Sequence, residues 1–396
     1  MMKNKCVVLG VTGGIAVYKA LDIASMLRKH DIDVNVIMTN SATQFVTPLT
    51  FQSISQNMVT TDMFSEPKAW EIQHISLAKK ADVFLVAPAT ANIIGKVANG
   101  IADDMLSTTI MATNAKVIFA PAMNTNMYNN PIVQENIKKL KSLGYDFIEP
   151  ASGRLACGDE GKGKLESPEI IVEKVLCELY ENKDLIGKKV IVTAGPTRAS
   201  LDPVRFISNN SSGKMGYEIA KEARDRGADV TLISGPTKEK KPYGVKVVDI
   251  VTNEEMFNEI NKIYDDADIV IKAAAVADYK AKSYSEQKIK KGDGDLEFKM
   301  TRDRDILKHL GENKHQQILI GFAAESENLL DNAKSKLIRK NLDYIVANDI
   351  TANDTGFASD DNKVVIISKD GEEVNLEKMT KREVAKNIFD TLKKKR

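Results

Sequence analysis

"KCVVLGVTGG" at residues 5–14 and "IAVYKALDIASML" at residues 15–27 decide the fold of the first half of the chain. The first stretch is an apolar, β-branched run that ends in glycines, and the second repeats apolar residues at helical spacing. This order predicts a buried strand, a tight turn and an amphipathic helix. A unit of that kind normally opens a parallel α/β sheet.

Similar apolar runs recur along the chain. In the first half they lie at 34–38, 82–87 and 116–120, with helical stretches between them, and this rhythm predicts a doubly wound domain. The pattern restarts with "KKVIVTAGPT" at 188–197. Further strands are expected at 229–233, 268–271 and 318–321, and helices at 168–180, 214–226, 254–263 and 326–340. The segment 362–368 and a helix from 378 onward complete the second domain. We therefore expect two consecutive α/β domains with mostly parallel sheets, 1–185 and 186–396.

Two segments lack either periodicity. Residues 151–164 are polar and rich in glycine, and residues 280–299 combine glycine with charge. Both are predicted to be long loops without secondary structure, and the first is a candidate lid.

Composition excludes several function classes. The 396 residues include 56 basic and 55 acidic side chains, so no net field favours nucleic acid or an anionic membrane. No apolar run is long enough to span a bilayer and no signal peptide is recognised, which predicts a cytoplasmic protein without membrane or nucleic-acid partners. The three cysteines, Cys6, Cys157 and Cys177, have neither disulfide nor zinc spacing.

The first glycine loop fails the dinucleotide fingerprint. Gly10, Gly13 and Gly14 do not form GxGxxG, and no acidic residue follows the second strand to bind a ribose. Two interpretations remain open. The glycines form a structural turn, or Thr12 and the loop amides bind a mononucleotide phosphate.

Three further features of the first half are candidate site elements. The loops at 87–92 and 120–127 are rich in small and amide residues, and Thr90, Asn92 and Asn124 suit a polar heterocycle or an amide substrate. His74 is either a surface or core histidine or a catalytic group. Cys157 lies in the glycine-rich segment, whereas Cys6 and Cys177 lie in apolar elements.

The second half carries a candidate anion site. "NSSGKM" at 210–215 lacks the first glycine and the Ser or Thr of a P-loop. Arg198 and Arg205 nevertheless precede a predicted helix N-terminus, which favours carboxylate or phosphate recognition. Asp278 follows a buried strand, and Lys288, Lys290, Lys291, Lys336 and Lys340 are either solvated charge or contacts to a triphosphate.

Ten motifs resemble two known enzyme families. The first half is similar to flavin-dependent phosphopantothenoylcysteine decarboxylases at Thr12-Gly13-Gly14, 88–92, 121–124 and 156–159. The second half is similar to phosphopantothenate-cysteine ligases at 195–198, 202–205, 211–216, 273–279, 321–325 and 339–343. Bacteria commonly fuse these enzymes of coenzyme A biosynthesis in this order. The resemblance implies a flavodoxin-like flavoprotein domain followed by a Rossmann-like ligase domain.

For the first half, the resemblance implies FMN chemistry. FMN would oxidise the thiol side of the cysteinyl group, carbon dioxide would leave, and the reduced flavin would return the electrons. Cys157 would donate the final proton, while His74 and Asn124 would position the thiol and carboxylate. The FMN-binding residues would be Thr12, Gly13, Gly14, Thr39, Pro88, Ala89, Thr90 and Ser107.

For the second half, it implies that CTP and Mg²⁺ activate 4′-phosphopantothenate as an acyl cytidylate, which cysteine captures. Asn209 and Arg205 would hold the acyl intermediate and the substrate. The CTP-binding residues would be Ala274, Asp278, Lys288, Arg304, Asp305, Ile306, Leu307, Phe322, Lys336 and Lys340. CTP rather than ATP is inferred from the fused bacterial form, and the resemblance assigns no magnesium ligand here.

The chain departs from the family pattern at a few positions. Asn210 stands where histidine is frequent, Tyr128 where tryptophan is frequent, and Asp303-Arg304 where an Asn-Pro pair is frequent. Two alternative functions are an NAD(P)-dependent oxidoreductase and a non-catalytic flavin-binding protein. The resemblance also implies a homo-oligomer.

Overall fold

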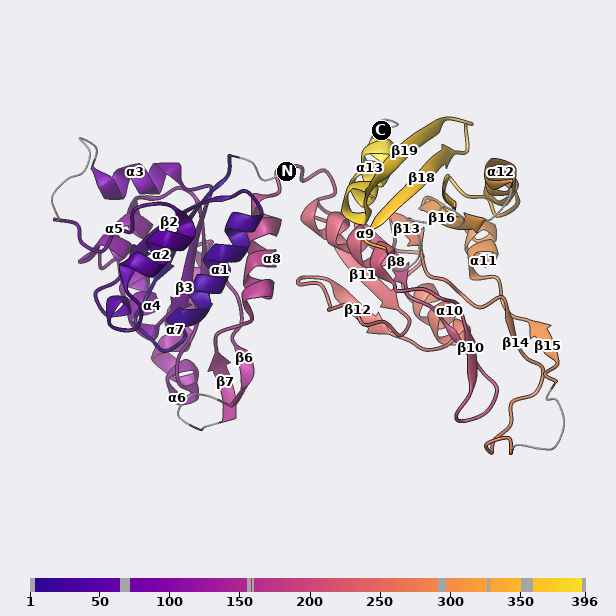
Figure 1. Cartoon of the computed structure of the whole chain (residues 1–396), viewed down its shortest axis with the longest axis horizontal. Coiled ribbons are helices and arrows are strands. Elements are labelled where there is room, and N and C mark those ends of the chain that lie inside the picture. Colours follow the sequence, from indigo (N-terminus) through magenta and orange to yellow (C-terminus); the bar gives the residue numbers. More distant parts are fainter. Residues whose placement is uncertain are drawn as a thin grey trace. The chain divides into compact units, whose positions relative to one another are not determined.

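The computed structural model describes residues 4–64, 72–154, 158, 160–290, 297–325, 328–349 and 359–393, without the side chains of 325 and 349. The chain divides into two compact units, Met1–Glu181 and Asn182–Arg396 (Figure 1). The sequence places the boundary after residue 185, and the structure groups residues 182–185 with the second unit.

The first unit is built on a parallel sheet with the order β2-β1-β3-β4-β5, the flavodoxin-like arrangement. Its strands are β1 (Cys6–Val11), β2 (Asp33–Met38), β3 (Val83–Ala89), β4 (Lys116–Pro121) and β5 (Asp146–Phe147). Its helices are α1 (Val17–Lys29), η1 (Ala42–Gln44), α2 (Pro48–Ser55), α3 (Gln73–Lys80), α4 (Ala91–Ala98), α5 (Met105–Ala112), α6 (Thr125–Asn129), α7 (Pro131–Ser142) and α8 (Pro168–Leu179).

Helices cover both faces of this sheet. One core packs side chains of α1, α2 and α8 against the strands, and the other packs those of α4, α5 and α7 against the opposite face. Because both faces are covered, β1 and β3 are buried along their whole length. This is why they appear in the sequence as continuous apolar runs.

The second unit has the Rossmann strand order. Its large sheet runs β12-β11-β8-β13-β16-β17, all parallel, and is extended by antiparallel β18 and β19. These strands are β8 (Lys189–Ala194), β11 (Asp229–Ser234), β12 (Lys246–Asp249), β13 (Ile269–Lys272), β16 (Ile318–Glu325), β17 (Tyr344–Asp349), β18 (Asp361–Ser368) and β19 (Glu373–Thr380). The helices are α9 (Lys214–Asp225), α10 (Asn253–Asn261), α11 (Ile306–Glu312), α12 (Leu329–Arg339) and α13 (Lys381–Lys393).

A buried arginine joins several elements of the second unit. Helices α9 and α13 cover one face of its sheet, and α10, α11 and α12 cover the other. Arg226, which is fully buried after α9, pairs with Glu222 at 2.7 Å, with Asp390 of α13 and with Asp184 at 3.2 Å. The last contact explains why residues 182–185 fold with this unit.

The fold class predicted from the sequence is confirmed, but the prediction of one long loop is wrong. Within residues 151–164, β6 (Ala151–Arg154) and β7 (Glu160–Lys164) form an antiparallel hairpin beside α6 (Figure 1). Cys157 of this segment lies outside the described residues.

The sequence also did not predict two smaller hairpins of the second unit. They are β9 (Arg198–Ser200) with β10 (Phe206–Ser208), and β14 (Tyr279–Ala281) with β15 (Met300–Arg302). The second predicted loop thus begins inside β14, while its described residues 282–290 and 297–299 form no helix or strand.

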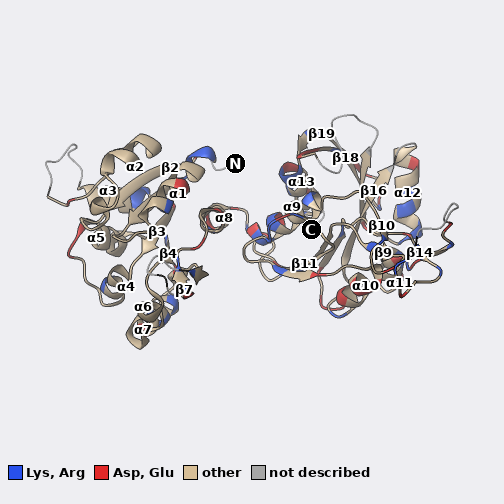
Figure 2. Ribbon diagram, turned by 60° about the horizontal axis from the view of Figure 1, so that its bottom comes forward, with Lys and Arg blue, Asp and Glu red and all other residues tan. Residues whose placement is uncertain are grey.

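Charged residues of both signs are interspersed over each unit (Figure 2). Among the described helices, none is both long and apolar enough to cross a bilayer.

Alanine substitutions at two helical glycines should have opposite effects on stability. A Cβ on Gly216 of α9 would lie 2.6 Å from the Cβ of Ala194 and 2.9 Å from the carbonyl oxygen of Thr193, whereas a Cβ on Gly95 of α4 would meet nothing nearer than 3.8 Å. Gly216→Ala should therefore destabilise the second unit by about 1–3 kcal/mol through overpacking. Gly95→Ala should stabilise the first unit by up to about 1 kcal/mol.

Differential scanning calorimetry of both variants tests this pair. A Gly216→Ala protein that melts at or above the temperature of the parent would contradict the close packing of α9 on β8.

Candidate active sites

The first unit has a cavity of about 690 Å³ at the carboxyl edge of its sheet. It lies at the switch point between β1 and β3, where open α/β sheets bind ligands. The loops after β1, β3 and β4, the start of α1 and the β6–β7 hairpin all contribute. The cavity is lined by Gly13, Gly14, Ile15, Ala16, Tyr18, Lys19, Pro88, Thr90, Ala91, Ala122, Met123, Asn124, Met127, Arg154, Gly163, Lys164 and Leu165.

Thr12 connects two of these loops instead of lining the cavity. Its buried hydroxyl donates to the carbonyl oxygen of Pro88 at 2.6 Å and accepts from the backbone N–H of Thr90 at 3.1 Å. The side chain therefore fixes the loop after β1 to the loop after β3. Any contribution of Thr12 to a phosphate site in this conformation has to come from its backbone.

The two glycines of the first loop have different surroundings. A Cβ on Gly13 would lie 2.4 Å from the Cβ of Ser41 and 2.9 Å from its carbonyl oxygen, so only glycine fits there. The nearest neighbour of a Cβ on Gly14 would be Thr90, at 3.9 Å. Gly13 is thus required by packing, while Gly14 leaves an open approach to the backbone from the cavity.

The β6–β7 hairpin packs directly on the loop that carries Asn124. The N–H of Met123 donates to the carbonyl oxygen of Gly163 at 2.9 Å, and a Cβ on Gly163 would lie only 2.3 Å from the carbonyl oxygen of Met123. Asn124 caps α6 by accepting from the N–H of Asn126 at 2.8 Å. The hairpin therefore forms one wall of the cavity beside Asn124.

Glu149 joins the hairpin to α6 and α7. Its carboxylate pairs with Lys162 of β7 at 2.8 Å and with Lys141 of α7 at 2.9 Å, and it accepts from the hydroxyl of Tyr128 at 2.9 Å. Desolvation acts to raise the pKa of Glu149, but these three hydrogen bonds lower it to about 2. Tyr128 is thus a buried donor that helps to hold the hairpin.

Five of the expected residues of this half line the cavity together: Gly13, Gly14, Pro88, Thr90 and Asn124. Others lie elsewhere. Thr39 follows β2 and bonds to the backbone of Val11, Ala89 is buried in β3, and Ser107 caps α5 with Asp104. His74 lies on α3, outside the residues that line the cavity.

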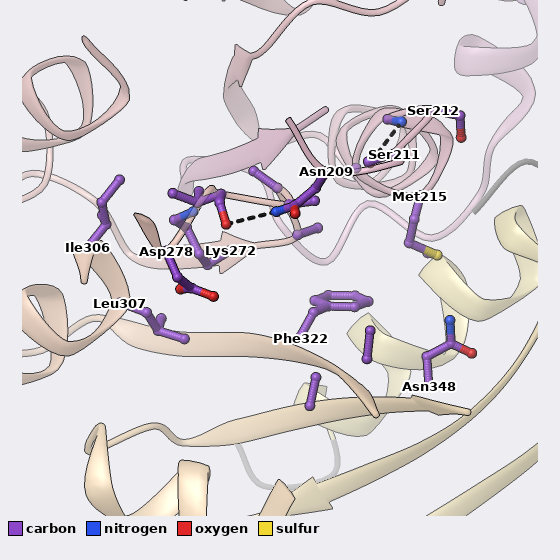
Figure 3. A pocket seen from close by; sticks show the side chains of 18 of the residues that line it. Asn209, Ser211, Ser212, Met215, Lys272, Asp278, Ile306, Leu307, Phe322 and Asn348 are labelled. Carbon is purple, nitrogen blue, oxygen red and sulfur yellow. Dashed lines mark hydrogen bonds between the residues drawn. The ribbon is translucent and has the colours of Figure 1, made fainter. Parts of the chain in front are cut away.

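The second unit has a cavity of about 410 Å³ at the corresponding edge of its sheet (Figure 3). Its walls come from the start of α9, the ends of β13, β16 and β17, the N-terminus of α11 and one side of α12. They comprise Asn209–Gly216, Lys272–Val276, Asp278, Arg304–Leu307, Phe322–Ala324, Lys336, Lys340, Asn348, Asn362 and Lys381.

Positive charge dominates this cavity. Its lining has six basic residues, Lys214, Lys272, Arg304, Lys336, Lys340 and Lys381, against the carboxylates Asp278 and Asp305. Lys340 pairs with Asp305 at 2.8 Å, and Lys336 donates to the carbonyl oxygen of Phe322 at 3.0 Å. An excess of basic groups in a concave site favours a polyanionic ligand.

An aromatic side chain packs against Arg304, which lines the cavity just before α11. The guanidinium of Arg304 lies 3.9 Å from the ring centroid of Phe257, a cation–π contact. Ile306 and Leu307 are buried behind it, and Asp305 caps the helix by accepting from the N–H of Lys308 at 3.0 Å. The segment 304–307, which departs from the family pattern just before Asp305, is therefore firmly held.

Asn209 is held close to the end of β13. Its side-chain amide donates to the carbonyl oxygen of Val276 at 2.9 Å. In the view of Figure 3 it lies above Asp278, and Phe322 lies between Asp278 and Asn348. The expected nucleotide residues other than Lys288 all line this cavity, Ala274 included.

Arg205 and Lys288 do not line the cavity of this unit. The Arg205 guanidinium bonds to Asp202 at 2.7 Å and to the carbonyl oxygen of Ile289 at 3.0 Å, so it joins the β9–β10 hairpin to the segment after β14. Desolvation acts to raise the pKa of Asp202, but backbone N–H groups and Arg205 lower it to about 2.

Four lining residues, Lys272, Asn348, Asn362 and Lys381, were missed by the sequence interpretation. Lys272 is buried at the end of β13, and the side-chain oxygens of Asn348 and Asn362 are buried without a hydrogen-bond partner among the described residues. For Lys272 a signal exists, because it ends the apolar run Ile269-Val-Ile-Lys272. The two asparagines have no comparable signal.

Comparisons with known proteins cover nearly the whole chain. A family model described as "Flavoprotein" matches residues 1–179, and one described as "DNA/pantothenate metabolism flavoprotein C-terminal domain" matches residues 185–395. The chain is 50% identical to the coenzyme A biosynthesis bifunctional protein CoaBC of Bacillus subtilis (strain 168), over 99% of this chain and 97% of that protein.

A second such relative comes from Borreliella burgdorferi. The chain is 47% identical to its coenzyme A biosynthesis bifunctional protein CoaBC, over 99% of this chain and 100% of that protein. A crystal structure of the C-terminal domain of a CoaBC protein is 43% identical, covering 54% of this chain and 96% of its own, with a TM-score of 0.46.

The hairpin contact yields a matched pair of variants. Gly163 (φ +149°) and Gly153 (φ +146°) share a backbone conformation that side chains rarely adopt, but a Cβ on Gly153 has nothing within 4 Å. Gly163→Ala should therefore break the Met123–Gly163 hydrogen bond and separate the hairpin from the loop of Asn124. Gly153→Ala carries only the shared backbone strain.

Amide hydrogen exchange at Met123 distinguishes the two. We expect it to be faster in Gly163→Ala and close to the parent in Gly153→Ala. Equal exchange in both variants would show that the hairpin does not pack on this loop.

Proposed function

Because this chain belongs to the family of bifunctional coenzyme A biosynthesis proteins, we propose that each of its two cavities is the active site of one activity. The chain is an enzyme with both a decarboxylase and a ligase domain in coenzyme A biosynthesis. We assign the ligase reaction to the basic cavity of the second unit and the decarboxylase reaction to the cavity of the first.

The observation that carries this assignment is the different chemistry of the two walls. The basic cavity has six basic side chains against two carboxylates, which suits a nucleoside triphosphate and a phosphorylated substrate. The other cavity has Gly14, Ala91 and Ala122 in its wall, small residues that let a flat ring approach the backbone. Its volume of about 690 Å³ lies within the usual range of cofactor sites.

In the basic cavity, the carboxylate of 4′-phosphopantothenate attacks the α-phosphorus of CTP. The bond to the β-phosphate oxygen breaks, pyrophosphate leaves, and the amine of cysteine then displaces CMP from the acyl cytidylate and loses a proton. Lys336 and Lys340 offset the charge that develops on the leaving phosphates. Asp278, Ala274, Phe322 and the segment 304–307 surround the nucleotide, and Asn209 holds the acyl group.

Lys288 and Arg205 keep their expected roles only as predictions. Both belong to segments around the β9–β10 hairpin and the end of β14, outside the cavity lining of this unit. Their contribution requires either movement of these segments or a second copy of the chain, and the expected homo-oligomer offers the latter.

Mg²⁺ would arrive with the nucleotide. Among the described residues no group of three His, Cys, Asp or Glu side chains could hold a metal ion. Mg²⁺ is commonly bound by one or two carboxylates together with substrate phosphates and water. The cavity therefore fits a metal carried by the triphosphate, and we assign no protein ligand to it.

In the first cavity, FMN when bound supplies reversible two-electron oxidation of the cysteinyl thiol side of the substrate. The residues of the protein bind FMN and the substrate and orient them. Asn124 presents its amide group beside the hairpin wall, and Gly14 and Thr90 leave the backbone accessible. The hairpin excludes water from the reactive sulfur species. Cys157, which lies between β6 and β7 in the sequence, donates the final proton. His74 is not among the residues that line this cavity, so its positioning role stays a prediction. The cytoplasmic location expected from the sequence stays a prediction.

A coupled assay tests the proposed function. Purified protein with 4′-phosphopantothenate, cysteine, Mg²⁺ and CTP should form 4′-phosphopantetheine and release one carbon dioxide per pyrophosphate, and ATP should support a lower rate. A yellow protein with a flavin spectrum is expected. A colourless protein that reduces NAD(P) would favour the oxidoreductase alternative, and a yellow protein without turnover would favour the non-catalytic one.

Asn209→Asp should separate the two activities. The substitution removes the amide donor that bonds to Val276 and places a carboxylate against that carbonyl and against the anionic acyl cytidylate. We expect pyrophosphate release to fall by about 100-fold or more, equivalent to about 2.7 kcal/mol. Decarboxylation of supplied phosphopantothenoylcysteine should stay at the rate of the parent.

Cys157→Ser is the complementary control. It should form phosphopantothenoylcysteine at the parent rate, bind FMN and release carbon dioxide, but stall before the reduced product. Loss of decarboxylation in Asn209→Asp, or full product from Cys157→Ser, would contradict the assignment of these residues.

A further inference from the structure

Lys272 is a buried lysine in the wall of the basic cavity. It is the last residue of β13, pairs with Thr193 of β8 and Gly321 of β16, and is only 6% exposed. Its ammonium makes one hydrogen bond to a described residue, to the thioether sulfur of Met256 at 3.5 Å. A thioether is a weak acceptor, so the charge has almost no hydrogen-bond compensation.

The charged groups around Lys272 come from three directions. Lys336 of α12 and Lys340, which directly follows α12, act on it from one side. Asp305 acts on it from the N-terminus of α11, and Asp278 from the loop after β13. Met256 covers it from α10 without charge. Asp305 is already paired with Lys340 at 2.8 Å, so it does little to balance a further cation.

This environment disfavours the charged amine when the cavity holds no ligand. Burial first, and then the neighbouring charges of Lys340 and Lys336, lower the pKa of Lys272 to about 7. Near neutral pH a substantial share of free protein molecules therefore carries Lys272 as an uncharged amine, unlike an ordinary lysine with a pKa of about 10.4.

We propose that Lys272 is a nucleotide-binding residue that takes up a proton when a nucleoside triphosphate enters the cavity and gives it back when pyrophosphate has left. The inference rests on the proposed ligase function of this cavity. The proton comes from solvent, no covalent bond to the protein forms, and the positive charge is present only while the polyanion offsets it. Lys272 then adds to Lys336 and Lys340 on the phosphates.

Such a residue favours triphosphates over less charged nucleotides. The gain in protonation of Lys272 depends on the negative charge nearby, and a monophosphate brings much less of it than a triphosphate. The preference should therefore be greatest above pH 7, where the amine of the free protein is neutral and must be protonated by binding.

Isothermal titration calorimetry with Mg²⁺ and CTP, without the other substrates, measures this uptake. Each titration is run at pH 6, 7, 8 and 9 in two buffers with different ionisation enthalpies. Proton uptake by the parent should rise from near zero at pH 6 towards about one per site at pH 8. Its affinity for CTP should fall by up to about tenfold per pH unit above pH 7.

Lys272→Met is the variant that tests the residue. It should show only the small proton exchange of the nucleotide phosphate itself, whose own pKa is about 6, and a flat affinity above pH 7. Lys308→Met is the matched control, because Lys308 pairs on the surface of α11 with Glu312 at 3.7 Å and is not part of the cavity. Lys308→Met should keep the uptake of the parent.

Thermal unfolding of the free protein gives a second readout. The pKa of Lys272 is lowered by folding, so between about pH 7 and pH 10 the unfolded chain binds more protons and the stability of the parent rises with pH. Lys272→Met should raise the melting temperature most at pH 7 and below, and the difference should narrow towards pH 10. If Lys272 had a merely structural role, the same substitution would lower the melting temperature of the protein.

The outcomes separate the inference from the function on which it rests. If the parent does not bind CTP, the proposed ligase site is wrong. If CTP binds but Lys272→Met keeps the proton uptake of the parent, the site stands and the role of Lys272 is wrong. Should Lys272→Met fail to fold, Lys272→Arg replaces it, because a permanently charged guanidinium must abolish the uptake.

Discussion

Parallel pairing of the central strands is the constraint on which both sites depend. Strands that run in one direction end at one edge, so the segments following β1, β3 and β4 meet there although more than a hundred residues separate the first from the last. The same holds for β8, β13 and β16 of the second unit. Each cavity forms at the switch point of its sheet, where the strand order reverses and the loops of two neighbouring strands diverge.

Both units use threonine hydroxyls to fix that gap. In the first, Thr12 bonds to the backbone of Pro88 and Thr90. In the second, Thr193 accepts from the N–H of Ala274 at 3.1 Å, and Thr197 accepts from that of Ala277 at 2.9 Å. Each bond satisfies a buried or half-buried backbone group and joins the first strand or the loop after it to the loop of its neighbour across the switch point. The loops are thereby held in place without any ligand.

The sequence predicts those parts of the structure that depend on local periodicity. Buried strands such as 5–10 can be recognised from their continuous apolar runs, and the loops after them from their glycines. The β6–β7 hairpin does not, because its stability comes from distant partners such as Met123 and Glu149 and its glycines show no alternation. The bond of Thr12 to Pro88 likewise depends on residues that are far apart in the sequence. Most candidate nucleotide residues could be predicted through family resemblance, since the lysines alone are indistinguishable from solvated charge.

Each unit closes its own hydrophobic core on both faces of its own sheet, and the chain divides cleanly between Glu181 and Asn182. Among the described residues, each core consists of apolar side chains from one unit. Covalent continuity is therefore not needed to complete either fold, and its effect is of a different kind. One translated message yields one ligase and one decarboxylase, so the copy numbers of two consecutive enzymes stay equal however strongly the gene is expressed.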